Sequence, residues 1–419
     1  MNINNKIPKT KRRDTCRVCG SNKLSELFSL GNQYINNFVS KEDIYHGVKA
    51  PLELIFCEVC SLVQLRHTAP QELLYKRYYW YKSGITKTMR KALLGISNQI
   101  EKRFNIKKGD IVLDIGSNDG TLLRSYKTQG IITVGVEPAD NLLLEGKIGL
   151  TYHIHDFWNY KTYIDRIKKK AKVITAIGMF YDMEDPNQFI YDAGKALTDD
   201  GVFIAQLMCL KNMIDSNDVG NICHEHLEYY SLDSLEYLFN KNGLDIFDIE
   251  LNDVNGGSYR VFAKLTDNPK EQTNQEMERI DAVRLSEEKL SNKETFKKFF
   301  NRLELNKKKC FDFINKAVKN GKSVWVYGAS TKGNVILQYY GIDKNLIEFA
   351  SERSSWKWNK YTIGTGIKCL SEDDARKANP DYFLVLPYAF FNEMYSREKK
   401  WRSQGGKFIL PLPEFRVIE

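Results

Sequence analysis

Apolar and polar positions alternate in blocks between residues 96 and 266. Short apolar runs, each about the length of one strand, are separated by amphipathic stretches. The four clearest runs cover residues 111–115, 132–136, 173–177 and 202–207. Strands that alternate with helices are typical of a mostly parallel α/β sheet. We therefore predict one α/β domain over residues 96–266.

A second α/β pattern follows a helical stretch in the C-terminal third. Apolar residues recur at helical spacing in the charged segment 268–320, and Gly321 stands where a helix is expected to end. Residues 323–327 then have the pattern of a strand, a glycine-containing turn leads into a helix, and residues 382–386 supply a later strand. We predict that residues 267–419 form a helical linker and a C-terminal Rossmann-like α/β domain.

Residues 14–95 contain two Cys-x-x-Cys pairs, Cys16 with Cys19 and Cys57 with Cys60. Each pair places two thiolates on one tight turn, and two such turns can supply a tetrahedral four-sulfur zinc site. Two unrelated pairs, or a redox pair, are the alternatives. Because four protein ligands would fill the zinc site, we expect it to be structural, in a small zinc-binding domain that also carries an aromatic segment.

Length and charge limit the remaining possibilities. A chain of 419 residues is too long for one core and is expected to form two or three domains. Part of its net charge of +9 lies in residues 1–13, which we expect to be a disordered basic leader. No apolar run suits a membrane helix or a secretory signal. We expect a cytoplasmic monomer or weak dimer that binds neither membrane nor nucleic acid.

A glycine-rich turn follows the first strand of the central domain. Gly116 and Gly120 would let the backbone approach a ligand at the carboxyl edge of the sheet. A pyrophosphate prefers an uncharged or cationic lining, whereas Asp114 and Asp119 flank this turn, with Asn118 between them. The acidic lining favours the cationic methionine part of S-adenosylmethionine. An NAD enzyme is the rival, but Gly-x-x-x-Gly departs from its Gly-x-Gly-x-x-Gly.

Two further carboxylates are expected in the same cofactor site. Glu137 ends the second strand, where an acidic residue can accept hydrogen bonds from both ribose hydroxyls. Asp156 follows the next apolar segment and is our candidate for holding the adenine amine. Together with the glycine turn, these positions predict a methyltransferase that uses S-adenosylmethionine.

Three ionisable residues in succession, His224, Glu225 and His226, precede a helix that begins after Ser231. If this segment is extended, the two histidines face one side and the glutamate the other. Such a cluster is a candidate for the general base of the reaction. A second metal site is disfavoured, because the histidines lack the i, i+4 spacing of a metalloprotease pair.

Two more segments are candidates for binding a substrate. A glycine turn leads to Ser258 and Arg260, and it is either a plain hairpin or an anion site. The aromatic segment ends with Tyr81 and Ser83, and its rings either pack in a core or form a stacking surface.

With these residues assembled, the chain resembles the bacterial nucleotide-sugar C-methyltransferase family, whose members act on keto-deoxysugars attached to a nucleoside diphosphate. The resemblance covers nearly the whole length. It rests on the two cysteine pairs, Tyr81-Lys-Ser83-Gly84, Asp114-Ile-Gly116-Ser-Asn118-Asp119-Gly120, His224-Glu225-His226-Leu-Glu-Tyr-Tyr-Ser231, Gly256-Gly257-Ser258-Tyr-Arg260, Tyr327-Gly328-Ala329-Ser-Thr-Lys332-Gly333-Asn334 and Pro411-Leu-Pro413.

The resemblance implies a zinc domain, a central class I methyltransferase sheet and a C-terminal Rossmann-like domain, with the sugar nucleotide between them. It also implies that a base removes a proton next to the sugar ketone, and that the enolate carbon attacks the sulfonium methyl group. His226 is the best candidate base, with Glu225 orienting it or sharing the task. Lys332 and Asn334 would face the nucleotide.

Two positions depart from the family. Cys223 stands where members that methylate the sugar ring often carry tyrosine, and residues 178–182 differ from a histidine-bearing segment, although Tyr181 could replace the missing hydroxyl. An O-methyltransferase for a sugar or small molecule, a zinc-ribbon RNA methyltransferase and a scaffold without activity are the alternatives. Few lysines lie between the cysteine pairs, which disfavours the RNA enzyme.

Overall fold

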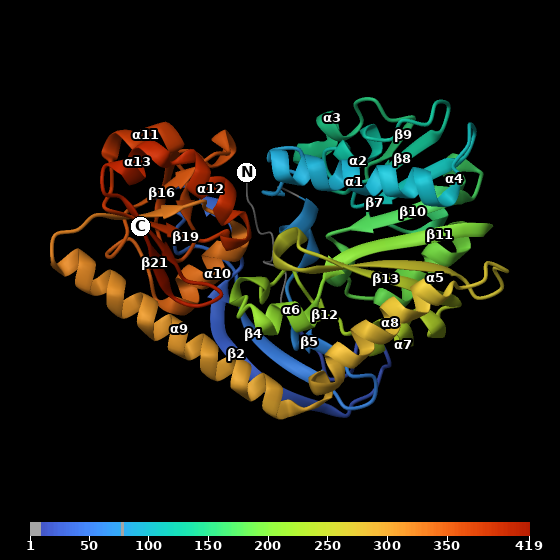
Figure 1. The fold of residues 1–419 in the computed structure, drawn as a ribbon, viewed down its shortest axis with the longest axis horizontal. Coiled ribbons are helices and arrows are strands. Elements are labelled where there is room, and N and C mark those ends of the chain that lie inside the picture. Colours follow the sequence, from blue (N-terminus) through green and yellow to red (C-terminus); the bar gives the residue numbers. More distant parts are fainter. Residues whose placement is uncertain (1–9, 77–78) are drawn as a thin grey trace, which may run out of the picture.

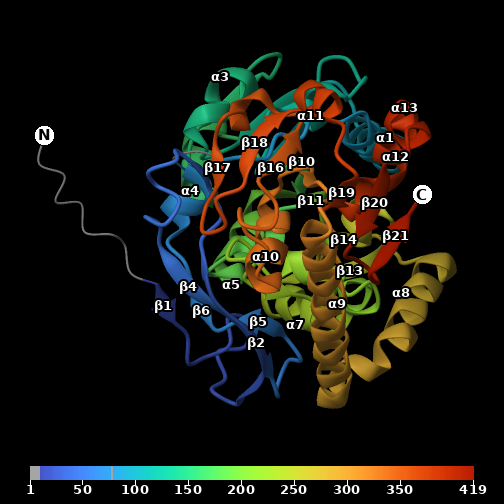
Figure 2. The same cartoon turned by 90° about the vertical axis from the view of Figure 1, so that its left-hand side faces the viewer.

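A computed structural model describes residues 10–76 and 79–419 and shows three connected parts (Figure 1). The central part and the C-terminal part lie at opposite ends of the molecule, and N-terminal strands run beneath and between them. Seen from the side, the long helix α9 (Lys293–Lys319) runs from the level of the N-terminal strands up to the C-terminal part (Figure 2). The predicted class of fold, a mixed α/β protein with a cysteine cluster near its N-terminus, is confirmed.

The central part is built on one large sheet. Its strands are β7 (Ile111–Ile115), β8 (Ile132–Val136), β9 (Tyr152–Ile154), β10 (Ala171–Ile177), β11 (Leu197–Met208), β13 (Leu244–Asn252) and β14 (Ser258–Leu265). Their order is β13-β14-β11-β10-β7-β8-β9. The last five are parallel, and β13 and β14 form an antiparallel hairpin at one edge. Buried parallel strands are continuous apolar runs, which is why the sequence revealed them.

Helices connect these strands and cover both faces of the sheet. They are α1 (Lys87–Phe104), α2 (Thr121–Arg124), α3 (Leu143–Gly146), α4 (Tyr160–Ile167), α5 (Pro186–Ala196) and α7 (Leu232–Lys241). After β11 the chain passes through α6 (Leu210–Asp215) and the short helix η4 (Val219–Asn221). The turn after η4 carries residues 223–226 past the carboxyl ends of the parallel strands, where open α/β sheets bind ligands.

The N-terminal part pairs with both of the others. Its main sheet contains β2 (Leu24–Tyr34), β4 (Lys49–Cys57), β5 (Val63–Leu65) and β12 (Glu228–Tyr229). Strand β12 belongs to the central part by sequence, yet it pairs with β5. Strand β3 (Phe38–Val39) pairs with β17 (Tyr361–Thr362) of the C-terminal sheet. The three parts are therefore joined by backbone hydrogen bonds as well as by side chains.

The C-terminal part is a second α/β sheet. Its other strands are β15 (Val324–Tyr327), β16 (Phe349–Glu352), β18 (Lys368–Ser371), β19 (Tyr382–Val385), β20 (Lys407–Leu410) and β21 (Arg416–Ile418). The sheet order is β21-β20-β19-β15-β16-β18-β17-β3. Its helices are α10 (Thr331–Tyr340), α11 (Glu372–Ala378), α12 (Phe391–Arg397) and α13 (Lys399–Ser403). Helix α8 (Asn274–Glu287) and α9 form the predicted helical link to this sheet.

Two of our expected boundaries differ from the structure. Residues 1–9 of the expected leader lie outside the described residues, but β1 (Lys11–Arg12) is ordered because it pairs with β6 (His67–Thr68). Helix α1 crosses the boundary that we placed between residues 95 and 96, since Thr86 caps the helix start by accepting from the Met89 amide. In the described part of the chain, no helix is long and apolar enough to span a membrane.

Candidate active site

The four predicted zinc ligands meet at the edge of the N-terminal part. Their sulfur atoms all lie within 4.8 Å of one another. The sulfurs of Cys16 and Cys60 are 3.5 Å apart, and those of Cys19 and Cys57 are 3.4 Å apart. Four thiolates at these separations match a tetrahedral zinc site with bonds of about 2.3 Å. The donor set is complete without water or substrate, so the zinc is structural.

Both cysteine turns have the same backbone design. In the first turn the amide of Gly20 donates to the carbonyl of Cys16 at 3.0 Å, and in the second Ser61 donates to Cys57 at 3.0 Å. Gly20 and Ser61 have φ values of 78° and 58°, a left-handed conformation that brings the chain back under the sulfurs. Glycine suits this position, which explains the Cys-x-x-Cys-Gly signal in the first pair.

The glycine turn after β7 lies among buried carboxyl groups. Parallel pairing sets Asp114 opposite Thr175, whose hydroxyl donates to Asp114 Oδ1 at 2.6 Å. Burial raises the pKa of Asp114 to about 7. The Glu137 carboxylate accepts from the amides of Asn118 and Ala139, both at 2.9 Å, so it is held facing the loop. Two of the predicted cofactor carboxyls therefore lie at adjacent strand ends.

The residues of this turn fit a bound S-adenosylmethionine. Gly116 has φ 71°, and a β-carbon there would lie 2.8 Å from Cγ of Met179. At Gly120, with φ 77°, a β-carbon would lie 2.9 Å from the carbonyl oxygen of Gly146. Both positions require glycine for a close approach. The hydroxyl of Ser117 is buried without a hydrogen-bond partner among the described residues, which leaves a polar group available to a ligand.

Asn118 and Asp119 have a different contact from the one we expected. Asn118 Oδ1 accepts from the amide of Ser83 at 2.9 Å, and Asp119 Oδ2 accepts from the amide of Gly84 at 2.7 Å. These side chains therefore fasten the end of the aromatic segment onto the glycine turn. Asp156 is exposed after β9, and its carboxylate accepts from the amide of Phe157 at 2.8 Å.

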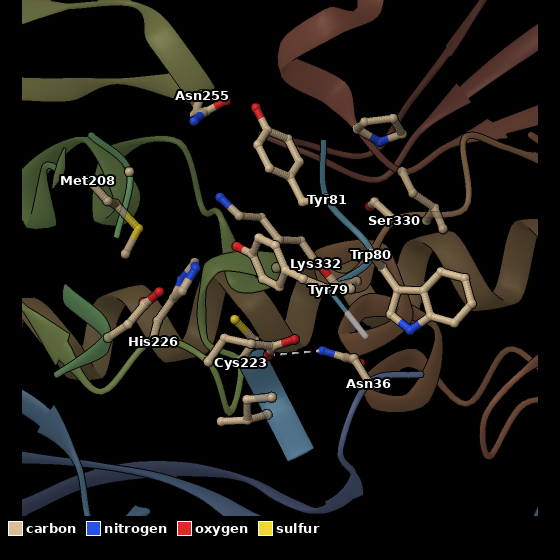
Figure 3. A pocket seen from close by; sticks show the side chains of 18 of the residues that line it. Asn36, Tyr79, Trp80, Tyr81, Met208, Cys223, His226, Asn255, Ser330 and Lys332 are labelled. Atoms are coloured by element: carbon tan, nitrogen blue, oxygen red, sulfur yellow. Dashed lines mark hydrogen bonds between the residues drawn. The ribbon is translucent and has the colours of Figure 1, made fainter. Parts of the chain in front are cut away.

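A cavity of about 550 Å³ opens beside this turn and is lined by all three parts of the molecule (Figure 3). The N-terminal part contributes Asn36 and the aromatic segment, and the C-terminal part contributes Lys332 and Tyr388. The central part contributes the strand ends of β10 and β11 and the segment around residue 225. Of the predicted site residues, the cavity is lined by Tyr81, Ser83, Tyr181, Glu225, His226, Ser258 and Lys332.

His226 is buried in the cavity wall with one ring nitrogen fixed (Figure 3). Its Nδ1 lies 2.9 Å from the carbonyl oxygen of Asn221. A carbonyl only accepts, so Nδ1 carries the proton and Nε2 has the free lone pair. Burial, with the positive charge of Lys332, holds the pKa of His226 well below its usual range. The imidazole is therefore neutral at physiological pH.

His224 and Glu225 do not alternate with His226 as an extended segment would require. The chain turns here, with the amide of His226 donating to the carbonyl of Cys223 at 3.1 Å. As a result Glu225 and His226 both line the cavity, and His224 is directed away from it. His224 is buried and bonds through Nε2 to the carbonyl of Ala50 at 2.9 Å, a contact with the N-terminal strand β4.

Several acidic groups surround Lys332 in the cavity. Burial raises the pKa values of Asp182, Asp218 and Glu225, and the charge of Lys332 opposes this shift in each case. The Tyr181 ring packs edge-on against His226 with ring centres 4.6 Å apart, and its hydroxyl donates to the carbonyl of Gly178 at 3.0 Å.

Two predicted substrate residues lie away from the cavity. Arg260 sits within the sheet, where its guanidinium donates to Gln206 at 2.8 and 3.1 Å and to Gln99 at 2.5 Å. Asn334 is a buried residue of α10, and its amide donates to the carbonyl of Ile363 at 3.4 Å. Both side chains are used for packing between strands or helices.

Sequence reasoning missed other groups that line the cavity or brace its wall. Asn36, Trp80, Asp182, Asp218 and Tyr388 line the cavity, and Asn221 holds His226. The aromatic run before Tyr81 and the acid after Tyr181 were visible in the sequence. Asn36 and Tyr388 come from parts of the chain whose placement against the central sheet has no local signal.

Comparisons with known proteins agree with this architecture. Family models match in order: a zinc binding domain over residues 16–75, a methyltransferase domain over 86–249 and a C-methyltransferase C-terminal domain over 253–413. The C-methyltransferase NovU of Streptomyces niveus is 30% identical over 421 residues, covering 97% of each chain.

Among the solved structures similar to this chain are two methyltransferases, each of which matches less than half of it. A S-adenosylmethionine-dependent methyltransferase from Clostridium acetobutylicum is 13% identical, covering 43% of this chain and 93% of its own, with a TM-score of 0.32. Magnesium protoporphyrin IX methyltransferase from Synechocystis is 11% identical, covering 44% and 90%, with a TM-score of 0.34. On the family models and the full-length relative, the chain belongs to the C-methyltransferase family and is an S-adenosylmethionine-dependent enzyme with a structural zinc site.

Proposed function

We propose that this enzyme methylates a carbon next to the ketone of a keto-deoxysugar linked to a nucleoside diphosphate. The observation that carries the proposal is the state of His226, which is neutral, fixed through Nδ1 and placed in the wall of a three-part cavity. A carbon acid next to a ketone needs such a base, because the proton must leave before the carbon can attack.

Each proton moved and each bond formed or broken in the proposed reaction is accounted for by His226, the substrate and the cofactor. His226 Nε2 takes the proton from the carbon next to the ketone, and the bond electrons form an enolate. Bound S-adenosylmethionine supplies an electrophilic methyl group, so a carbon–carbon bond forms as the carbon–sulfur bond breaks. Glu225 also lines the cavity, and burial raises its pKa above that of an exposed glutamate, so its carboxyl group holds a proton more readily and can share the proton transfer.

The aromatic groups at one side of the cavity support a nucleotide as the carrier of the sugar. Trp80 lines the cavity, and the ammonium group of Lys360 lies 5.8 Å from the centre of its ring. Tyr79 and Tyr81 line the same cavity. Flat rings can stack on a nucleobase, and lysines can neutralise a diphosphate. This combination suits a sugar nucleotide better than a free sugar.

Transfer from methyl-deuterated S-adenosylmethionine tests this function. Keto-deoxysugars linked to thymidine, uridine or guanosine diphosphate are supplied separately, each with its reduced alcohol as the control. We expect a trideuteromethyl group on a carbon of one keto sugar and none on its alcohol. A methyl ether, or equal transfer to ketone and alcohol, would show an O-methyltransferase. Transfer to the unlinked sugar at the same kcat/KM would remove the nucleotide from the proposal.

A further inference from the structure

The carbonyl that fixes His226 belongs to a residue whose side chain is itself held on both sides. Asn221 Nδ2 donates to Asp218 Oδ2 at 2.5 Å, and Lys332 Nζ donates to Asn221 Oδ1. The Asp218 carboxylate also accepts from the hydroxyl of Tyr388 at 3.0 Å. Asn221 is almost completely buried, so neither side-chain bond is replaced by water.

These contacts cross between two parts of the molecule. Asn221 and Asp218 lie at η4 in the central part, whereas Lys332 lies in the first turn of α10 and Tyr388 begins η8 (Tyr388–Phe390) in the C-terminal part. A β-carbon at Gly220 would lie 3.2 Å from the carbonyl oxygen of Lys332. The two backbones therefore approach closely at this point, and Gly220 leaves room for it.

We propose that Asn221 and Lys332 act as positioning residues through which docking of the C-terminal part sets the tautomer and the neutral state of His226. Asn221 aims its carbonyl at Nδ1, which leaves Nε2 as the basic nitrogen. Lys332 holds the Asn221 side chain and places a positive charge near the imidazole. The inference deepens the proposed function, because it assigns Lys332 to the base and not to the nucleotide.

The charges around the imidazole determine how the pKa of His226 changes when Lys332 is removed. The Lys332 charge disfavours a second proton on His226, in addition to the effect of burial. The other titratable groups at this corner of the cavity are Tyr75, Tyr79, Tyr181, Asp182, Asp218, Cys223, Glu225, Tyr388 and Tyr229, whose hydroxyl donates to the same Asn221 carbonyl at 3.3 Å. Without Lys332 the three carboxyls hold their protons more firmly, since its charge favours their ionised forms. That change alone would lower the pKa of His226, but the loss of the repulsion between Lys332 and a protonated imidazole acts on His226 directly and raises its pKa.

Nitrogen NMR of protein labelled in its imidazole rings measures the tautomer and the pKa of His226 directly, and it needs no substrate. The six histidines are labelled with nitrogen-15, and His226→Gln identifies the resonances of that ring. In the unchanged enzyme we expect a protonated Nδ1 and a bare Nε2, with no titration near the usual pKa of about 6.5. In Lys332→Met we expect the pKa of His226 to rise by roughly one unit or more.

Two matched variants separate charge from packing. Lys332→Arg keeps the cation and should leave the titration of His226 near that of the unchanged enzyme. Lys319→Met removes one positive charge from the exposed end of α9 and should have no effect on His226. A bare Nδ1 in the unchanged enzyme, or an unchanged pKa in a folded Lys332→Met, would overturn the proposal.

A variant at Gly220 tests the docking contact without removing a charge. Gly220→Ala inserts a methyl group against the Lys332 carbonyl and should loosen the contact, giving a mixture of His226 tautomers in the same spectra. A single unchanged tautomer would count against the coupling. If the NMR results hold but no keto sugar is methylated, the proposed substrate fails while the control of His226 by the C-terminal part stands.

Discussion

Arg17 and Glu228 form an ion pair in which both side chains are completely buried, with Nε and Oε1 3.5 Å apart. Arg17 lies within the first zinc turn, directly after Cys16, and Glu228 lies two residues after His226. Arg17 Nε is also 3.4 Å from Glu184, two residues after Asp182. One arginine of the zinc turn therefore braces both segments that bring acid and base groups to the cavity.

Replacing this arginine should destabilise the protein strongly. Arg17→Met leaves Glu228 buried without its cation, a change that costs about 3–5 kcal/mol in the free energy of unfolding. Arg12→Met, which removes an exposed arginine, is the control and should have little effect. Denaturant unfolding measures both. Equal stability of the two variants would show that the buried pair does not brace the fold.

The destabilisation by Arg17→Met should also depend on pH. Burial already raises the pKa of Glu228, and the Arg17 charge opposes that shift. Without Arg17 the folded state binds a proton at Glu228 more firmly than the unfolded state does. The unfolding free energy of the variant should therefore fall as pH rises, relative to the unchanged protein. If the difference in unfolding free energy between the variant and the unchanged protein were constant from about pH 5 to 8, this prediction would be contradicted.

Zinc should be lost with any one of its four ligands. Cys57→Ser should reduce the metal content from about one zinc per chain to near zero and lower the melting temperature, since ligand loss removes binding energy from the folded state. Cys310→Ala changes a buried cysteine of α9 outside the cluster and should retain the zinc. Metal analysis of the purified proteins checks both results. Full zinc in Cys57→Ser would exclude Cys57 as a ligand.

Cofactor affinity should depend on the ionisation of Asp114. Its pKa of about 7 means that the carboxyl ionises as pH rises from about 6 to 7.5, and a carboxylate attracts the cationic cofactor. Binding measured by calorimetry should therefore strengthen over this range. Asp114→Asn should bind the cofactor more weakly, and its affinity should no longer depend on pH in this range. Asp156→Asn tests the separate adenine contact. If the cofactor affinity of Asp114→Asn still rose steeply with pH, the titration would belong to another group.

The two neighbouring histidines should have separable effects. His226→Gln should lower kcat by about 10²- to 10⁴-fold, as expected for a lost general base, with cofactor affinity retained. His224→Gln should lower the melting temperature, because it disturbs a buried bond to Ala50, and should affect kcat far less. Steady-state kinetics and thermal unfolding distinguish them. A larger kcat loss in His224→Gln would reverse the assignment.

Local patterns predicted much of this molecule. The cysteine spacing identified the four sulfurs that meet, and the apolar runs identified β7 and β8, because both signals depend only on nearby residues. The glycine turn was also visible, since Gly116 and Gly120 adopt conformations that other residues avoid. Asn118 and Asp119 were placed correctly in the turn, but their contacts with residues 83 and 84 depend on tertiary packing.

The wrong expectations have a common physical origin. Extended geometry would have placed His224 and His226 on one side, but a turn at Cys223 separates them. Arg260 follows Ser258 on the same face of β14, yet only Ser258 lies at the strand end that reaches the cavity. Side-chain direction in a turn, and position along a strand, are set by the fold and not by residue type.

Deuterium exchange measures the central claim most directly. The enzyme is incubated in deuterated water with a keto-deoxysugar nucleotide and S-adenosylhomocysteine, so that proton removal can occur without methyl transfer. We expect deuterium at the carbon next to the ketone with the unchanged enzyme, and at least about 10²-fold slower exchange with His226→Gln. Equal exchange in both proteins would contradict the role of His226 as the base.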